Sequence, residues 1–184
     1  DTVTNAQVEG APEVFLRFPT DTITLDPNAP QSVTISADLM VGQPTKPVFG
    51  LYGMSLAMTY PDFVNHNTIG YYTGTDFFGE SNLTLWMQRN NNSKQQLDMG
   101  FVRKTSTPVS GYGRIAKIDF QSDFIIIVDV ILREENDVMP FVVNISSLKG
   151  IDEHGNEMAL NVQTNTDTVW IKVPQISSGI FDVA

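Results

Sequence analysis

The sequence has no cysteine and only two histidines, and this scarcity excludes several kinds of chemistry. Without cysteine the chain cannot form disulfides, bind zinc through thiolates or use a thiol nucleophile. His66 and His154 each lie in a polar turn, without a second ligand at the spacing of a metal site. We interpret both as surface histidines and expect no zinc.

Long apolar runs and positive charge are also scarce. No run approaches the length of a membrane span. The chain has 21 acidic against 11 basic residues, a net charge of −10, which disfavours nucleic acid and anionic membrane as partners. Its length of 184 residues suits one all-β domain. We expect this domain over 13–173, between an N-terminal linker at 1–12, cut from a longer protein, and a C-terminal linker at 174–184.

Alternation of apolar and polar residues with a period of two is the strongest pattern present. It occurs twice between Gln95 and Gln121, on either side of the sequence SGYG at 110–113, where glycines permit a turn or a bulge. The alternation places Phe101 and Phe120 on buried strand faces and Lys117 on a solvated one. These two runs predict neighbouring strands of a β-sandwich.

Further strands are expected on both sides of this region, with Pro19 confining the first pair to an edge or to a switch between sheets. The run at Phe124–Leu132 is apolar on both sides, so a buried strand and a short buried helix both fit, and we favour the strand. The other predicted strands are Glu13–Phe18, Asp21–Leu25, Gln31–Val41, Phe49–Tyr60, Thr68–Thr73, Asp76–Phe78, Leu83–Arg89, Phe141–Leu148, Glu157–Val162 and Val169–Val173.

Catalytic and metal motifs are not convincing. Residues 53–57, GMSLA, partly imitate a nucleophile elbow, but they lie within a predicted strand and lack the second glycine. Several acids could in principle supply oxygens to calcium, yet no D-x-[DN]-x-[DN]-G loop occurs, so we interpret them as solvated turn residues. These acids are Asp62, Asp76, Asp152, Glu153 and Asp167. We therefore expect a non-catalytic domain without a cofactor, with calcium as a minor alternative.

Several segments together resemble the cohesin domain. They are DTITLDPNAPQSVTISADLMV, YGMSLAMTYPDFV, LDMGFVRK, SGYGRIAKIDFQ and LKGIDEHGNEMAL. The resemblance extends over about 13–173. It implies a jelly-roll β-sandwich of about nine strands, an extracellular or cell-surface setting within a modular bacterial protein, and binding of a dockerin or another protein module.

The resemblance also implies that four strands share one sheet whose outer face binds the partner. These strands are Phe49–Tyr60, Leu83–Arg89, Gln95–Lys104 and Phe141–Leu148. Alternation predicts that the outward residues are small and uncharged apart from Asp98, with Trp86 as the single aromatic anchor. The candidate binding residues are Ser55, Ala57, Thr59, Thr84, Trp86, Gln88, Asp98, Asn144 and Ser146, with Gly100 among them.

Two other functions remain open from the sequence. A carbohydrate-binding module would need two or more coplanar exposed aromatic rings, and a passive spacer would need neither rings nor a broad flat face. Trp86 could stack on a sugar, or a loop could fold over it and make it part of the core. With one ring predicted on the face, we rank protein binding above carbohydrate binding.

Overall fold

The computed structural model describes residues 7–26, 32–64, 69–71, 76–123, 126–128, 138–163 and 167–172. Strands dominate this part of the chain. Helical geometry is confined here to the 3-10 turns Ser81–Leu83 and Asn92–Lys94 and to residues 126–128. The predicted all-β class is confirmed.

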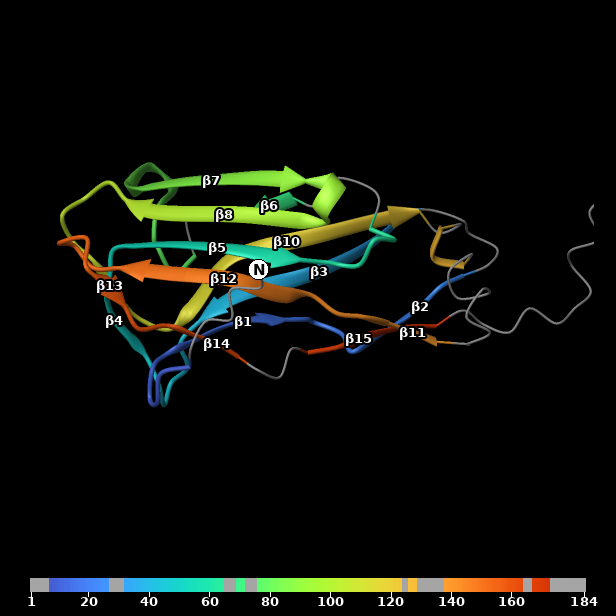
Figure 1. Ribbon diagram of the computed structural model, residues 1–184, viewed down its shortest axis with the longest axis horizontal. Helices are drawn as coiled ribbons and strands as arrows, with labels where there is room; N and C mark the ends of the chain where they lie inside the picture. Colours follow the sequence, from blue (N-terminus) through green and yellow to red (C-terminus); the bar gives the residue numbers. More distant parts are fainter. Residues whose placement is uncertain are drawn as a thin grey trace, which may run out of the picture.

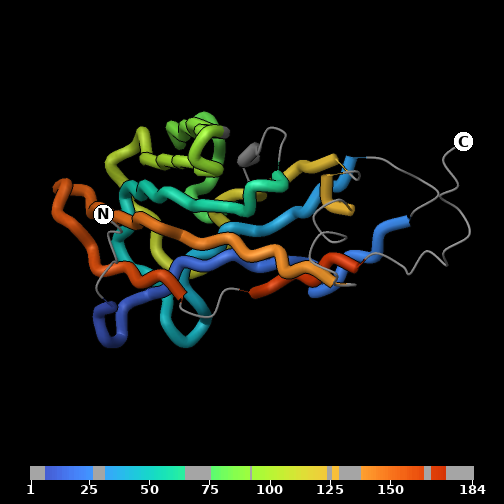
Figure 2. Tube along the Cα trace, turned by 45° about the vertical axis from the view of Figure 1, so that its right-hand side comes forward, coloured from blue at the N-terminus to red at the C-terminus, as the bar shows by residue number. Residues whose placement is uncertain are grey.

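Two five-stranded sheets form the layers of the sandwich (Figure 1, Figure 2). The sheet that we call the β3 sheet has the order β14-β1-β3-β10-β6. Its strands are β14 (Asn161–Val162), β1 (Glu13–Arg17), β3 (Ser32–Val41), β10 (Gly113–Asp123) and β6 (Ile69–Tyr71). The second, called the β5 sheet, has the order β13-β12-β5-β8-β7. Its strands are β13 (Glu157–Met158), β12 (Asn144–Ile151), β5 (Gly53–Thr59), β8 (Gln96–Arg103) and β7 (Thr84–Asn91).

Two smaller sheets connect the layers at their margins. A bridging sheet has the order β11-β15-β2, and a two-stranded ribbon pairs β4 with β9. Their strands are β11 (Val138–Phe141), β15 (Val169–Lys172), β2 (Thr22–Thr24), β4 (Val48–Leu51) and β9 (Val109–Gly111).

Aromatic rings fill much of the space between the two main sheets. Phe101 of β8 stacks on Phe78, with ring centroids 5.8 Å apart and an interplanar angle of 9°. Phe120 of β10 packs edge-on against Phe141, at 5.2 Å, and against Tyr60, at 5.8 Å. Aromatic pairs of this kind each stabilise a core by about 0.5–1.5 kcal/mol beyond the area they bury. The predicted burial of Phe101 and Phe120 is confirmed, at 3% and 1% exposure.

The switch between sheets predicted at Pro19 is also present. β1 pairs in parallel with β14 and antiparallel with β3, whereas β2, a few residues further on, pairs in parallel with β15. Proline has no N–H to donate to a ladder, so the strand path breaks at this point. One continuous segment thus belongs first to the β3 sheet and then to the bridging sheet.

Five predicted strands are wrong in whole or in part. Phe141–Leu148 covers the end of β11 and part of β12, and Glu157–Val162 is divided into β13 and β14. Phe49–Tyr60 is divided at Tyr52 into β4, which pairs with β9, and β5, which belongs to the β5 sheet. Within β4, Gly50 adopts a φ of 72° where the register of the β4–β9 pair shifts. Asp76–Phe78 forms a turn, in which the Gly79 N–H donates to the Asp76 carbonyl. In Phe124–Leu132 we favoured a strand over a short buried helix, but residues 126–128 are helical. A run that is apolar on both sides can be buried in either geometry, so periodicity could not decide.

Two arginines hold the turn that begins at Asp76. The Arg114 guanidinium donates to Asp76, with Nε 2.7 Å from Oδ1, and the Asp76 side chain is only 1% exposed. The hydrogen bond from Arg114 to this carboxylate, reinforced by the attraction of its charge, raises the pKa of Arg114. Arg103 and the Thr84 hydroxyl both donate to the Phe78 carbonyl. The turn is thereby fixed so that Phe78, at 0% exposure, inserts between the sheets.

We expect Phe101→Ala and Phe120→Ala each to reduce the free energy of unfolding by about 3–5 kcal/mol, because each leaves a cavity in the aromatic core. Lys117→Ala, on the solvated face of β10, is the matched control and should change stability by less than about 0.5 kcal/mol. Denaturant melts of the three variants measure this. Equal stabilities for all three would contradict the assignment of faces.

Candidate partner-binding face

The outer face of the β5 sheet is flat in its two central strands. Met54, Leu56 and Met58 of β5 are buried, which turns the residues between them to the other side. Their partners across the strand pair are equally small or polar, with Ser55 opposite Gly100 and Ala57 opposite Asp98. The predicted orientation of Ser55, Ala57, Thr59, Asp98 and Gly100 is therefore confirmed.

β12 continues this face on one side of β5. Asn144 is exposed and lies opposite Thr59, and Ser146 is exposed at a bulge, where its hydroxyl donates to the Ala57 carbonyl at 3.3 Å. Lys149, also exposed, lies further along β12 opposite Ser55. The four strands predicted to share a sheet do so, with β12 in place of Phe141–Leu148.

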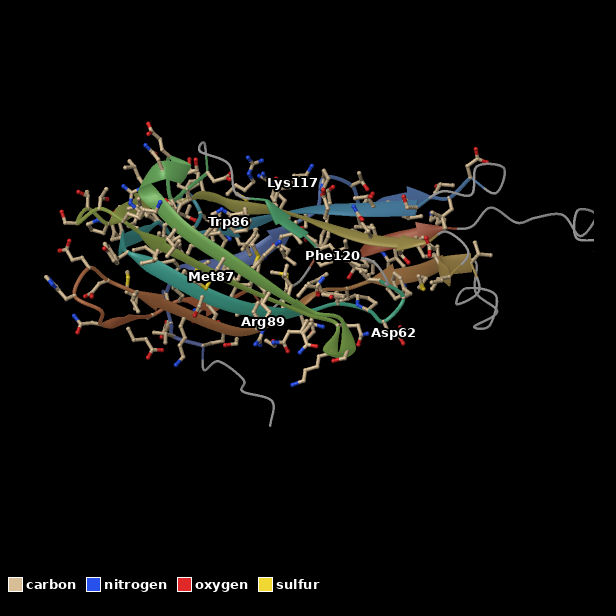
Figure 3. All side chains as sticks on the ribbon, turned by 90° about the horizontal axis from the view of Figure 1, so that it is seen from above. Asp62, Trp86, Met87, Arg89, Lys117 and Phe120 are labelled. Atoms are coloured by element: carbon tan, nitrogen blue, oxygen red, sulfur yellow. The ribbon has the colours of Figure 1, made fainter. Side chains whose placement is uncertain are left out.

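On the other side of the face, the predicted orientation of β7 is wrong. Thr84 is 2% exposed and Trp86 packs against the core, whereas Leu85 and Met87 are 48% and 63% exposed. Figure 3 shows Trp86 and Phe120 between the sheets and Met87 on the opposite side of β7. The cause is the register, because Trp86 lies opposite the core residue Phe101. Tryptophan therefore cannot anchor a partner here.

Gln88, the third outward residue predicted on β7, is nevertheless exposed. It lies opposite Met99, a core residue of β8, and so belongs to the inward side of an edge strand. Gln88 is thus accessible without being part of the outer face. Whether any predicted residue contacts a partner remains a prediction.

An apolar hollow of about 280 Å³ occupies one end of the outer face. Leu85 and Met87 line it from β7, Val102 from β8 and Ile151 from β12. Two glycines, Gly53 and Gly100, also line it. A Cβ added to Gly53 would lie 3.1 Å from Ile151 Cγ1, and one added to Gly100 would lie 3.5 Å from Met87 Cγ. The side chains of Ile151 and Met87 thus lie directly over the backbone of these two glycines. Alternation in β7 could have indicated Leu85 and Met87, had the strand been assigned to the opposite face.

The opposite end of the outer face is polar. Arg89 of β7 forms an ion pair with Asp98 of β8, with Nη2 2.8 Å from Oδ2, and Gln96 also donates to this carboxylate. An exposed pair of this kind contributes only about 0–1 kcal/mol to stability. The pair does neutralise the aspartate on the face. The surface therefore changes from apolar to polar along the strands, with Lys149 beside the hollow.

The outer face of the β3 sheet differs in its charge. Asp38 of β3 accepts from Arg17 at 2.9 Å and from Arg114 at 3.5 Å, and Lys117 lies 3.9 Å from Asp119. Interleaved charges of both signs are typical of a solvated surface. The two large faces of the sandwich are thus distinguishable, and the less charged one carries the hollow.

Groups with catalytic or metal-binding chemistry are scattered. Within the described residues, no three His, Asp or Glu side chains lie close enough to hold a metal ion. His154 lies in an exposed turn, and His66 lies outside the described residues. In the same turn, the Asn156 side-chain amide, together with backbone N–H groups, donates to Asp152 and lowers the pKa of that carboxyl. These bonds close the turn without forming a cation site.

Sequence comparison does not place the chain in a family, since no protein-family description and no curated protein matches it. Structural comparison shows its fold, which is that of a cohesin domain. A chain of the type I cohesin–dockerin complex Coh-OlpC-Doc435 from Clostridium thermocellum superposes with a TM-score of 0.65 at 10% identity, covering 93% of this chain and 99% of that one.

Two further cohesins show how widely this fold is shared. The second type II cohesin module of the adaptor scaffoldin ScaA from Acetivibrio cellulolyticus gives a TM-score of 0.60 at 10% identity, covering 88% of this chain and 98% of that one. A non-cellulosomal cohesin from the archaeon Archaeoglobus fulgidus gives a TM-score of 0.53 at 10% identity, covering 92% of this chain and 94% of that one. The cohesin-like β-sandwich expected from the resemblance is confirmed, although sequence identity is low.

The corrected orientation of β7 makes a specific prediction. Trp86→Ala should lower the free energy of unfolding by about 2 kcal/mol or more, because the ring packs against the core. Met87→Ser, on the next residue, should change it by less than about 0.5 kcal/mol, because that side chain is exposed. Thermal melts of both variants check this. A destabilised Met87→Ser beside an unaffected Trp86→Ala would restore the orientation predicted from the sequence.

Proposed function

We propose that this chain is a non-catalytic interaction module that binds a protein partner of the dockerin type through the outer face of the β5 sheet. The fold supports this, because several structures with the same fold are cohesins in complexes with dockerins. Function depends on sites and not on folds, so the argument must come from the face itself. The observation that carries it is the apolar hollow at one end of that face.

The hollow has the properties of an anchor site for a partner side chain. Leu85 and Met87 are large apolar side chains exposed together on a sheet edge, beside the partly buried Val102 and Ile151. Contiguous exposed apolar surface rimmed by polar residues is typical of protein interfaces. Methionine adapts to different partner shapes because its side chain is flexible and polarisable.

The rest of the face permits close approach. Ser55, Ala57 and Gly100 project little from the sheet, so a helix or loop of the partner can contact the strands along their length. Asn144 and Ser146 offer hydrogen bonds at the polar end, which fix the orientation of a partner rather than dominate its affinity. We propose that Met87 and Leu85 contribute most of the binding energy, which is the role that the sequence analysis assigned to Trp86.

Carbohydrate binding is less well supported by this face. With Trp86 turned inward, the outward residues of β5, β7, β8 and β12 include no aromatic ring within the described chain. Exposed rings do occur elsewhere, at Phe49, Tyr112 and Trp170. These residues lie on or beside the ribbon and the bridging sheet, outside the candidate face.

The setting that we propose is extracellular or on the cell surface, as part of a larger exported protein. The printed names of two similar structures support this, because they describe cohesins of cellulosomes and their scaffoldins. Among the described residues, no helix is long and apolar enough to cross a bilayer. The module would then hold its partner at the surface without a catalytic step of its own.

The proposal predicts that Ala57→Arg abolishes partner binding, because a long charged side chain would stand in the middle of the flat face. Met87→Ala should weaken binding about tenfold or more, which corresponds to about 1.4 kcal/mol. The chain is first used to capture proteins secreted by its source organism, which mass spectrometry identifies. Calorimetry with the purified partner then compares wild type, both variants and the control Lys117→Ala.

Lys117→Ala should bind as wild type does, because Lys117 lies on the other sheet. Melting curves establish that all variants are folded. Capture of no dockerin-bearing or other specific protein would refute the function, and full binding by Ala57→Arg would refute the face.

A further inference from the structure

The departure of β2 from the β3 sheet leaves part of β3 without a neighbour. β1 pairs with β3 from Val14 opposite Val41 to Arg17 opposite Asp38, and the pairing ends there. β10 continues beside β3 as far as Asp123 opposite Ser32. Along Ser32–Ala37, the edge of β3 that faces away from β10 therefore has no partner strand within the described chain.

The opposite side of this gap is also an open strand edge. β2 is the end strand of the bridging sheet and pairs only with β15 among the described residues (Figure 1). We call the space between β2 and Ser32–Ala37 the fork. In an antiparallel pair every second residue directs its backbone N–H and C=O away from its partner, so β3 presents a row of donors and acceptors to the fork.

This edge lacks the features that normally prevent strand pairing. Proteins protect open edges with proline, charged side chains or bulges. The residues Ser32–Ala37 read SVTISA and include no proline and no charge, and the bulge in the β3–β10 pair lies at the far end, between Arg114 and Ala116. The β-branched Val33, Thr34 and Ile35 favour extended geometry.

A hollow of about 270 Å³ lies in the fork. Its apolar part comes from Phe18, Pro19, Ile23, Ile35 and Val169. The hydroxyl-bearing residues Thr20, Thr34 and Ser36 complete its lining, and Thr34 is exposed. A cavity of about 150 Å³ already accommodates benzene, so the hollow has room for an aliphatic or aromatic side chain.

Charges near the fork are mostly negative. Asp21 and Asp26 are exposed on either side of β2, and Asp123 ends β10. Lys172 on β15 and Arg17 on β1, which is ion-paired with Asp38, are basic residues on neighbouring strands. With a net charge of −10 for the whole chain, the local potential favours a basic ligand.

We propose that the fork binds an extended basic peptide segment by strand addition to Ser32–Ala37. The backbone of the peptide completes the ladder of β3, one apolar side chain enters the hollow, and lysine or arginine residues on either side of it face the aspartates. A helix cannot take this place, because its backbone groups are already bonded to one another. Main-chain pairing with a pocket for alternate side chains is a known mode of peptide recognition.

The test uses the full chain and a phage-displayed library of short random peptides. Enriched peptides should be basic, free of proline in their central residues and alternating in apolar and polar residues. Synthetic copies, measured by fluorescence anisotropy, should bind Thr34→Trp at least about tenfold more weakly, because the indole fills the hollow. Thr34→Val keeps the shape of threonine and should bind as wild type does.

A second measurement reports the strand itself. Amide hydrogen exchange of residues 33–37 should slow when the enriched peptide binds, because the open N–H groups become hydrogen-bonded. Ala57→Arg should bind the peptide as wild type does, which separates this site from the proposed partner face. Failure of the partner-face experiment would therefore leave the fork untouched.

Several outcomes would overturn the proposal. These are a library without enriched sequences, enriched peptides that bind folded Thr34→Trp as well as wild type, and unchanged exchange at 33–37. A dimer of the chain alone would also overturn the proposal if Thr34→Trp dissociates it, because a second copy would then occupy the edge. Melting curves of each variant accompany the binding data, so that loss of folding is distinguished from loss of the site.

Discussion

Successive side chains of a strand point to opposite sides, so burial of one set decides which residues form the other face. This constraint determines the composition of the candidate face. In β5 and β8 the inward residues are large and apolar, so the residues between them must form the outer face. Because Phe101 stacks on Phe78 within the core, Gly100 is held on the outside with Met87 above it. The flat face is thus a consequence of core packing. A change of register by one residue would exchange the two surfaces.

The regular strands could be predicted because their two faces differ clearly in polarity. β5, β8 and β10 each bury one set of residues, and the alternation gave the correct orientation in all three. β7 could not be predicted in this way, because it is an edge strand with apolar residues on both faces. The pattern favoured burial of Leu85 and Met87, whereas in the structure Trp86 packs against the core. The polar part of the candidate face was therefore predicted and its apolar anchor was not.

The irregular parts depend on interactions between distant residues, which local patterns do not contain. The turn at Asp76 is stabilised by Arg114 and Arg103, which lie on two different sheets. An isolated strand pattern at Asp76–Phe78 carries no sign of these partners. The helical residues 126–128 follow β10 after a run in which burial on all sides is compatible with either geometry. The switch at Pro19 was foreseen because proline acts locally on the ladder.

The parallel pairing of the first and last strands has a mechanical consequence. β1 runs beside β14, and β2 beside β15, in the same direction, so the path enters the described fold at one end of the sandwich and leaves it at the other. A force that pulls these ends apart slides the paired strands along each other. The hydrogen bonds between them are then loaded together and not opened one after another. In a chain of linked modules under tension, this arrangement resists extension at the strand pair where the sandwich is closed.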